Sequence, residues 1–145
     1  MANPANSKKL WVVFLAVITL MSCVKENTPE VRLDNVVDTT IAMPKNEGQF
    51  TNGPYGRVSG SATIYKQDSD LVLALQDMQI SNGPQLHVYL SKEVQPVNFI
   101  DLGPLQSTLG NQLYKIPGKP DLTVYRFALV HCKKYNHLFG SAELK

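Results

Sequence analysis

The sequence contains only two cysteines among its 145 residues, Cys23 and Cys132, so no more than one internal disulfide can form. It also lacks the motifs of common hydrolases and transferases: there is no Gly-x-Ser-x-Gly, no His-Glu-x-x-His and no glycine-rich phosphate loop. Asp68 and Asp70 lie in a polar stretch and are typical of turn formers rather than of a catalytic carboxylate pair. The sequence therefore does not decide whether the protein is an enzyme, and a redox role is the chemistry it leaves open.

Long apolar runs are also absent. The most apolar stretch, residues 10–20, is much shorter than the about 20 residues that a membrane-spanning helix needs. Because Lys8 and Lys9 precede it, the stretch is typical of a signal peptide. The sequence Leu-Met-Ser-Cys at residues 20–23 resembles the lipobox of bacterial lipoproteins, in which the cysteine receives a diacylglyceryl group and the chain is cut before it. We therefore predict that residues 1–22 are a signal peptide and that Cys23 is lipidated. The alternative is an ordinary secretory signal.

Excess charge is absent from the predicted mature chain. Loss of Lys8 and Lys9 from the 14 basic residues leaves 12 basic and 12 acidic residues. A balanced chain lacks the basic surface of nucleic-acid-binding proteins, so nucleic acid is not an expected partner. The expected partner is a membrane, because several acyl chains on Cys23 would anchor the chain stably. Val24 stands where an Asp would signal inner-membrane retention, so we expect an extracytoplasmic protein at the outer membrane.

From Gly48 onward the sequence reads as a β protein. Residues 58–66 and 71–75 alternate apolar and polar side chains, which predicts two strands of a hairpin. Further strands are predicted at residues 86–90, 99–102, 113–116, 122–132 and 138–144, with Gly and Pro between them. The stretch 122–132 is apolar on both faces near its end, which indicates a central strand. About seven to eight short, mainly antiparallel strands predict an all-β sandwich or closed barrel.

The domain boundaries follow from this pattern. Residues 23–47 are polar and mixed, and we predict that they comprise the lipidated cysteine and a tether. Part of the stretch 31–43 carries apolar side chains and could dock on the domain. Residues 48–145 are predicted to form a single β domain.

Five short motifs in this region, in the same order, resemble the DM-thirteen domain, a family of small extracytoplasmic β domains. The matching segments are residues 58–62, 82–91, 101–105 with 110–117, 130–132 and 139–144. Two positions depart from the family pattern: Gln85 stands where Asp is common, and His131 stands where a Trp is expected before the cysteine. The resemblance implies a β domain that works in electron transfer or redox chemistry through its single cysteine, here Cys132. It also implies a redox protein as partner, and it names no cofactor.

Cys132 has two interpretations. Positive charge nearby lowers the pKa of a thiol and favours the reactive thiolate. In a regular strand Lys134 shares the face of Cys132, so Lys134 is the candidate thiolate-stabilising residue. The alternative is an inert thiol packed behind Ala128 and Val130, because free cysteine is among the most buried residue types.

The histidines near Cys132 raise the question of a metal site. Cys and His are good ligands for zinc, copper or haem iron. Adjacent strand residues point to opposite faces, so His131 and Cys132 cannot both reach one metal in a regular strand. A pair of Cys132 with His137 or His87 stays open, against the alternative of solvent-exposed histidines.

Tyrosines in or beside the predicted strands could form an aromatic sugar-binding surface. Tyrosine is also ordinary in strands, which is the simpler interpretation. The sequence therefore favours a lipid-anchored envelope protein whose β domain transfers electrons through Cys132. The alternative is a non-catalytic ligand-binding or structural module of the cell envelope.

Overall fold

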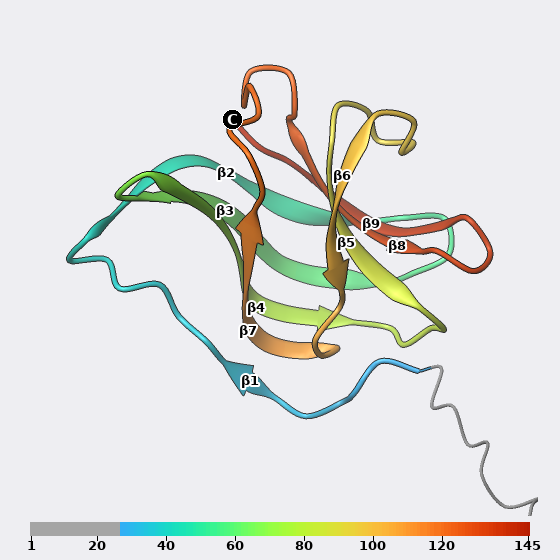
Figure 1. Cartoon of the computed structure of the whole chain (residues 1–145). Coiled ribbons are helices and arrows are strands. Elements are labelled where there is room, and N and C mark those ends of the chain that lie inside the picture. Colours follow the sequence, from blue (N-terminus) through green and yellow to red (C-terminus); the bar gives the residue numbers. More distant parts are fainter. Residues whose placement is uncertain (1–26) are drawn as a thin grey trace, which may run out of the picture.

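The computed structural model describes residues 27–145, and these residues form β strands and no helix (Figure 1). The predicted all-β class is therefore confirmed. No helix in this part of the chain is long and apolar enough to cross a bilayer. The predicted signal peptide, residues 1–22, and Cys23 lie outside the described residues. The strands are β1 (Leu33–Asp34), β2 (Ala42–Asn52), β3 (Val58–Gln67), β4 (Asp70–Ile80), β5 (Leu86–Ser91), β6 (Phe99–Pro104), β7 (Leu109–Ile116), β8 (Phe127–Cys132) and β9 (His137–Glu143).

The nine strands of residues 27–145 form one continuous sheet in the order β1-β7-β4-β3-β2-β9-β8-β5-β6. Neighbouring strands are antiparallel except β1 and β7, which are parallel. The sheet curls until β6 and β7 approach each other, but β6 remains an unpaired edge (Figure 1). The prediction of seven to eight strands in a sandwich or closed barrel is therefore wrong: the sheet has more strands and stays open.

The additional strands lie in the segment that was assigned to the tether. β2 begins at Ala42, before the predicted domain start at Gly48, and it joins the two halves of the sheet. It pairs with β3 over residues 42–49 and with β9 over residues 50–52. Most β2 side chains are exposed, and a bulge follows Pro44, so the sequence shows no apolar alternation there.

The strand before Cys132 is shorter than predicted. Residues 122–126 are not strand, because Asp121 forms a local turn in which its carboxylate accepts hydrogen bonds from the Thr123 amide at 2.9 Å and hydroxyl at 2.6 Å. β8 itself lies between β5 and β9. Its residues from Ala128 to Cys132 are buried on both faces, which confirms the predicted central strand.

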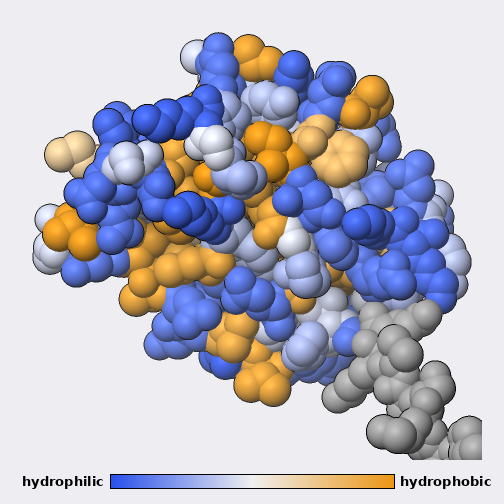
Figure 2. All heavy atoms as spheres, viewed as in Figure 1, coloured by the Kyte–Doolittle hydropathy of each residue, from blue (hydrophilic) through white to orange (hydrophobic). Residues whose placement is uncertain are grey.

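Apolar side chains pack on both faces of this part of the sheet. The main core fills the inside of the curl and includes Ile64, Leu73 and Leu90, each with no exposed surface. Burial of each such side chain stabilises the fold by about 1.5–3 kcal/mol. A smaller outer cluster covers the convex side of β5, β8 and β9 and consists of Tyr89, Leu129 and Leu138. Figure 2 shows apolar surface between β7 and β6, at the open side of the curl, interrupted by polar side chains.

Candidate functional site

Cys132 is the last residue of β8 and the one cysteine within residues 27–145. It pairs with Leu86 on β5 and with His137 on β9. Its thiol points into the core and donates a hydrogen bond to the Pro84 carbonyl oxygen at 3.1 Å. Only 1% of the residue is exposed. The thiol therefore has the buried position of the packing alternative, in one core cluster with Ala128 and Val130.

Lys134 does not continue the strand of Cys132. β8 ends at Cys132, and residues 133–136 form a turn to β9. The Lys134 ammonium lies over the Tyr135 ring, 5.4 Å from its centroid. The alternation that assigned Lys134 to the face of the thiol therefore ends two residues before Lys134, and the role of Lys134 in stabilising a thiolate stays a prediction.

The two histidines proposed as metal ligands have other partners. The His137 ring stacks on Tyr55, with ring centroids 3.6 Å apart. The His87 imidazole binds the Asp101 carboxylate, with 2.9 Å between Nδ1 and Oδ1. Within residues 27–145 no group of three or more His, Cys, Asp or Glu side chains could hold a metal ion.

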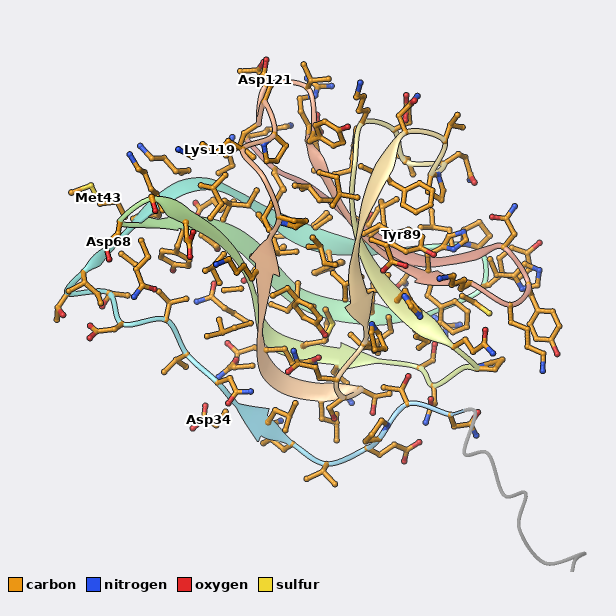
Figure 3. The ribbon with its side chains drawn as sticks, in the orientation of Figure 1. Asp34, Met43, Asp68, Tyr89, Lys119 and Asp121 are labelled. Carbon is orange, nitrogen blue, oxygen red and sulfur yellow. The ribbon has the colours of Figure 1, made fainter. Side chains whose placement is uncertain are left out.

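A second cluster lies on the outer face of β8, opposite the thiol. Alternation along β5 places His87 and Tyr89 on this face, and His131 of β8 lies beside them. The Tyr89 and His131 ring centroids are 5.4 Å apart, and Phe99 of β6 stacks on Tyr89 at 4.3 Å. Figure 3 labels Tyr89, which lies beside β5 and β6.

Asp101 is the charged centre of this cluster. Its carboxylate accepts hydrogen bonds from His87 and from the Gly103 amide at 2.9 Å, and the Lys133 ammonium lies 3.4 Å away. Burial alone would raise the pKa of the Asp101 carboxyl, but these donors outweigh it and lower that pKa. Asp101 therefore stays ionised with its charge matched by neighbouring groups.

Tyr89 and His131 are buried neutral groups. Burial, followed by the charges of Asp101 and Cys132, raises the pKa of the Tyr89 phenol. Burial, followed by the charge of His137, lowers the pKa of the His131 imidazole. His131 is 2% exposed, and neither ring nitrogen has a hydrogen-bond partner among the described residues. Such orphaned polar atoms are rare in folded proteins.

A cleft of about 250 Å³ adjoins this cluster and is lined by Tyr89, Phe99, Asp101, His131 and Lys133, together with Pro96 and Asn136. Larger depressions of about 470 and 420 Å³ lie near Asn52 and Arg57. We consider the smaller cleft the better candidate site, because the larger ones contain no buried titratable side chain.

The sequence pointed to His87 and His131 but not to Asp101 as their neighbour. A bulge in the β5–β6 pairing sets Tyr89 opposite Asp101, whereas regular pairing would set it opposite Leu102. Gly103 has φ +113° and permits this bulge. Gly103 is the sequence signal for a bulge. A glycine alone does not show which residue of β6 the bulge leaves without a partner on β5.

Comparison with known proteins gives a family match. A family model described as Electron transfer DM13 matches residues 49–144, which include both the thiol and the outer cleft. No curated protein sequence and no solved structure matches the chain.

Proposed function

Because the chain belongs to the Electron transfer DM13 family, we propose that it is a lipid-anchored extracytoplasmic domain that transfers electrons by thiol–disulfide exchange at Cys132. The observation that carries the proposal is the position of the thiol. The thiol lies at the C-terminal end of β8 and donates a hydrogen bond to the Pro84 carbonyl of a short loop between β4 and β5. The first described residues of the chain pack on that same loop.

The first described residues, Asn27 and Thr28, contact the same loop that binds the thiol. Asn27 forms a β-bridge with Pro84. Asn82 accepts a hydrogen bond from the Thr28 amide at 3.1 Å and donates to the Thr28 carbonyl at 2.9 Å. Cys23 precedes Asn27 by four residues, a distance of at most about 14 Å of extended chain. A lipid on Cys23 would therefore hold the Cys132 end of the domain close to the membrane.

Thiol–disulfide exchange at Cys132 proceeds through two mixed disulfides. The Cys132 thiol loses its proton, and its sulfur attacks a disulfide of a redox protein partner, which breaks the partner's S–S bond and forms a mixed disulfide. The partner's second sulfur leaves as a thiolate and takes up a proton. A donor dithiol protein then attacks the Cys132 sulfur of the mixed disulfide, which releases the partner's remaining sulfur as a thiolate that takes up a proton. The donor's second thiol attacks the new donor–Cys132 disulfide, closes a disulfide within the donor and releases Cys132 as a thiol. The net reaction moves two electrons from the donor dithiol to the acceptor disulfide.

Access to the buried thiol requires displacement of the loop at residues 82–84. The Asn82 side chain anchors this loop through Thr28, and its amide also donates to the Glu30 carboxylate at 2.7 Å. Opening this loop exposes the sulfur without unfolding the sheet. The reactivity of Cys132 is therefore expected to follow local opening of the loop.

Alkylation kinetics test this proposal. We expect iodoacetamide to modify Cys132 in the folded full chain, and Asn82→Ala to accelerate the reaction about fivefold for each about 1 kcal/mol of hydrogen bonding lost. The matched control is Asn98→Ala, which removes a hydrogen bond to Glu93 at 2.9 Å in the β5–β6 loop. If Cys132 reacts only at the rate of global unfolding in all three proteins, it is a packing residue and the exchange function is refuted.

Mass spectrometry tests the anchor separately. We expect the chain extracted from membranes to begin at Cys23 and to carry a diacylglyceryl group there. Cys23→Ser should stay uncut, because the processing peptidase acts on the lipidated cysteine. A Cys23→Ser protein that is still cut before residue 23 and still held at the membrane would contradict the lipoprotein assignment.

A further inference from the structure

The outer cleft contains buried hydrogen-bonding capacity that the fold does not use. Both His131 nitrogens lack partners among the described residues, although the side chain is almost fully buried and lines the cleft. A neutral imidazole presents one donor and one acceptor. Leaving this donor and this acceptor without hydrogen bonds costs free energy. A bound hydroxyl group would form a hydrogen bond with either of them. Tyr89 adds a phenol to the same wall.

The charges of the cleft indicate a neutral ligand. Asp101 is the acidic group in the lining, and His87, Lys133 and the Gly103 amide already surround its carboxylate. A ligand with a net charge would lack a counter-charge here, and burying it would be costly. The remaining wall consists of the apolar Phe99 and Pro96 and of the neutral Asn136.

The volume of the cleft limits the ligand to a single ring. Pockets for drug-sized molecules have about 300–1,000 Å³, and a cavity of about 150 Å³ holds benzene. At about 250 Å³ the cleft is too small for haem or a flavin and large enough for a six-membered ring with one or two substituents. A sugar of that size has hydroxyl groups all around its ring, and the apolar Phe99 and Pro96 would leave some of them unpaired, whereas a phenol carries one or two.

We propose that this cleft binds a small phenol, with its ring against Phe99 and Pro96 and its hydroxyl hydrogen-bonded to His131 and Tyr89. The proposal does not depend on Cys132, whose thiol lies on the opposite face of β8. The His131 nitrogens have no exposed surface, so the ligand must displace part of the wall. Phe99 is 40% exposed on the edge strand β6, so its ring can shift without opening the core.

The experiment is a titration of the membrane-extracted full chain with phenol and with hydroquinone, followed by NMR at the His131 and Tyr89 rings. Glucose and cyclohexanol are titrated in parallel. We expect saturable shifts at both rings with the two phenols, and weaker binding of cyclohexanol and glucose. His131→Phe should weaken phenol binding about tenfold, which corresponds to one lost hydrogen bond. The matched control His137→Phe, outside the cleft lining, should bind phenol like the unchanged chain.

Three results would overturn the proposal: no saturable shift with either phenol, equal binding of glucose, or unchanged phenol affinity in His131→Phe. If His131→Phe does not fold, Tyr89→Phe serves instead, with Tyr135→Phe as its control, because Tyr135 is exposed and lies outside the cleft lining. Tyr89→Phe is expected to weaken phenol binding to a similar extent, and unchanged affinity would again overturn the proposal.

Discussion

Replacing His131 by phenylalanine should stabilise the fold, although most substitutions of buried residues destabilise. The reason is the pair of orphaned nitrogens, which lose water on folding and gain no partner among the described residues. Phenylalanine keeps an aromatic ring beside Tyr89, 5.4 Å away between centroids in the unchanged chain, and removes both polar atoms. The substitution thus removes the cost of burying two unpaired nitrogens and keeps the packing of the aromatic ring.

The magnitude follows from the cost of an unsatisfied group. Burial of an unpaired donor or acceptor costs about 1–3 kcal/mol, and His131 contributes one of each when neutral. Phenylalanine is slightly larger, and overpacking takes back part of the gain. We therefore expect a net increase in the free energy of unfolding of about 1–3 kcal/mol. For a domain of this size the melting temperature should rise by about 4 °C for each kcal/mol.

Urea denaturation followed by far-UV circular dichroism measures this change. Trp11 is the single tryptophan and lies in the predicted signal peptide, so intrinsic tryptophan fluorescence does not report on the domain. His137→Phe is the control, because His137 is only half-buried and stacks on Tyr55. The control should change stability by less than about 0.5 kcal/mol. A His131→Phe protein that is no more stable than the unchanged chain would refute the reasoning.

Two further predictions concern pH and the edge of the sheet. Burial, then the charge of His137, lowers the pKa of His131 from 6.5, so below about pH 6.5 the unfolded chain binds a proton that the folded chain does not. Stability should therefore be full above that pH and fall below it by at most about 1.4 kcal/mol per pH unit, and His131→Phe should remove this slope in urea titrations between about pH 7 and 5. Gly110 has φ +93°, and a Cβ there would overlap the Leu33 backbone. Gly110→Ala should therefore release β1 and accelerate amide exchange at Asn35, whose amide donates to the Asn111 carbonyl at 3.1 Å; unchanged exchange would contradict this.

The strands that could be predicted are those whose two faces differ in environment. β3, β4 and β5 bury one set of side chains in the curl, so apolar residues alternate along much of their sequence. β2 buries only Ala42 and Phe50 and could not be recognised by that criterion. Its place in the sheet depends on backbone hydrogen bonds to β3 and β9, to which a polar sequence gives no clue. The closed shape was predicted wrongly because strand count and spacing do not determine whether the two edges pair.

The central residue of the thiol site was predictable, but the geometry around it was not. Cys132 was identified from the sequence, and the alternative of a packed thiol was stated with the right neighbours, Ala128 and Val130. The burial of the thiol against the Pro84 carbonyl could not be predicted, because Pro84 lies 48 residues away in sequence. Lys134 was assigned to the face of the thiol because a strand was assumed to continue past the residue where β8 ends.

The two proposed activities lie on adjacent residues of one strand, and alternation makes them separable. Cys132 points into the core and His131 points to the outer face, so a change at one removes a group from only one of the two sites. Cys132→Ala should abolish alkylation and leave phenol binding intact, whereas His131→Phe should weaken phenol binding and leave Cys132 modifiable. If both variants lost both properties, Cys132 and His131 would act as one site, and the assignment of two separate sites to the inner and outer faces of β8 would be wrong.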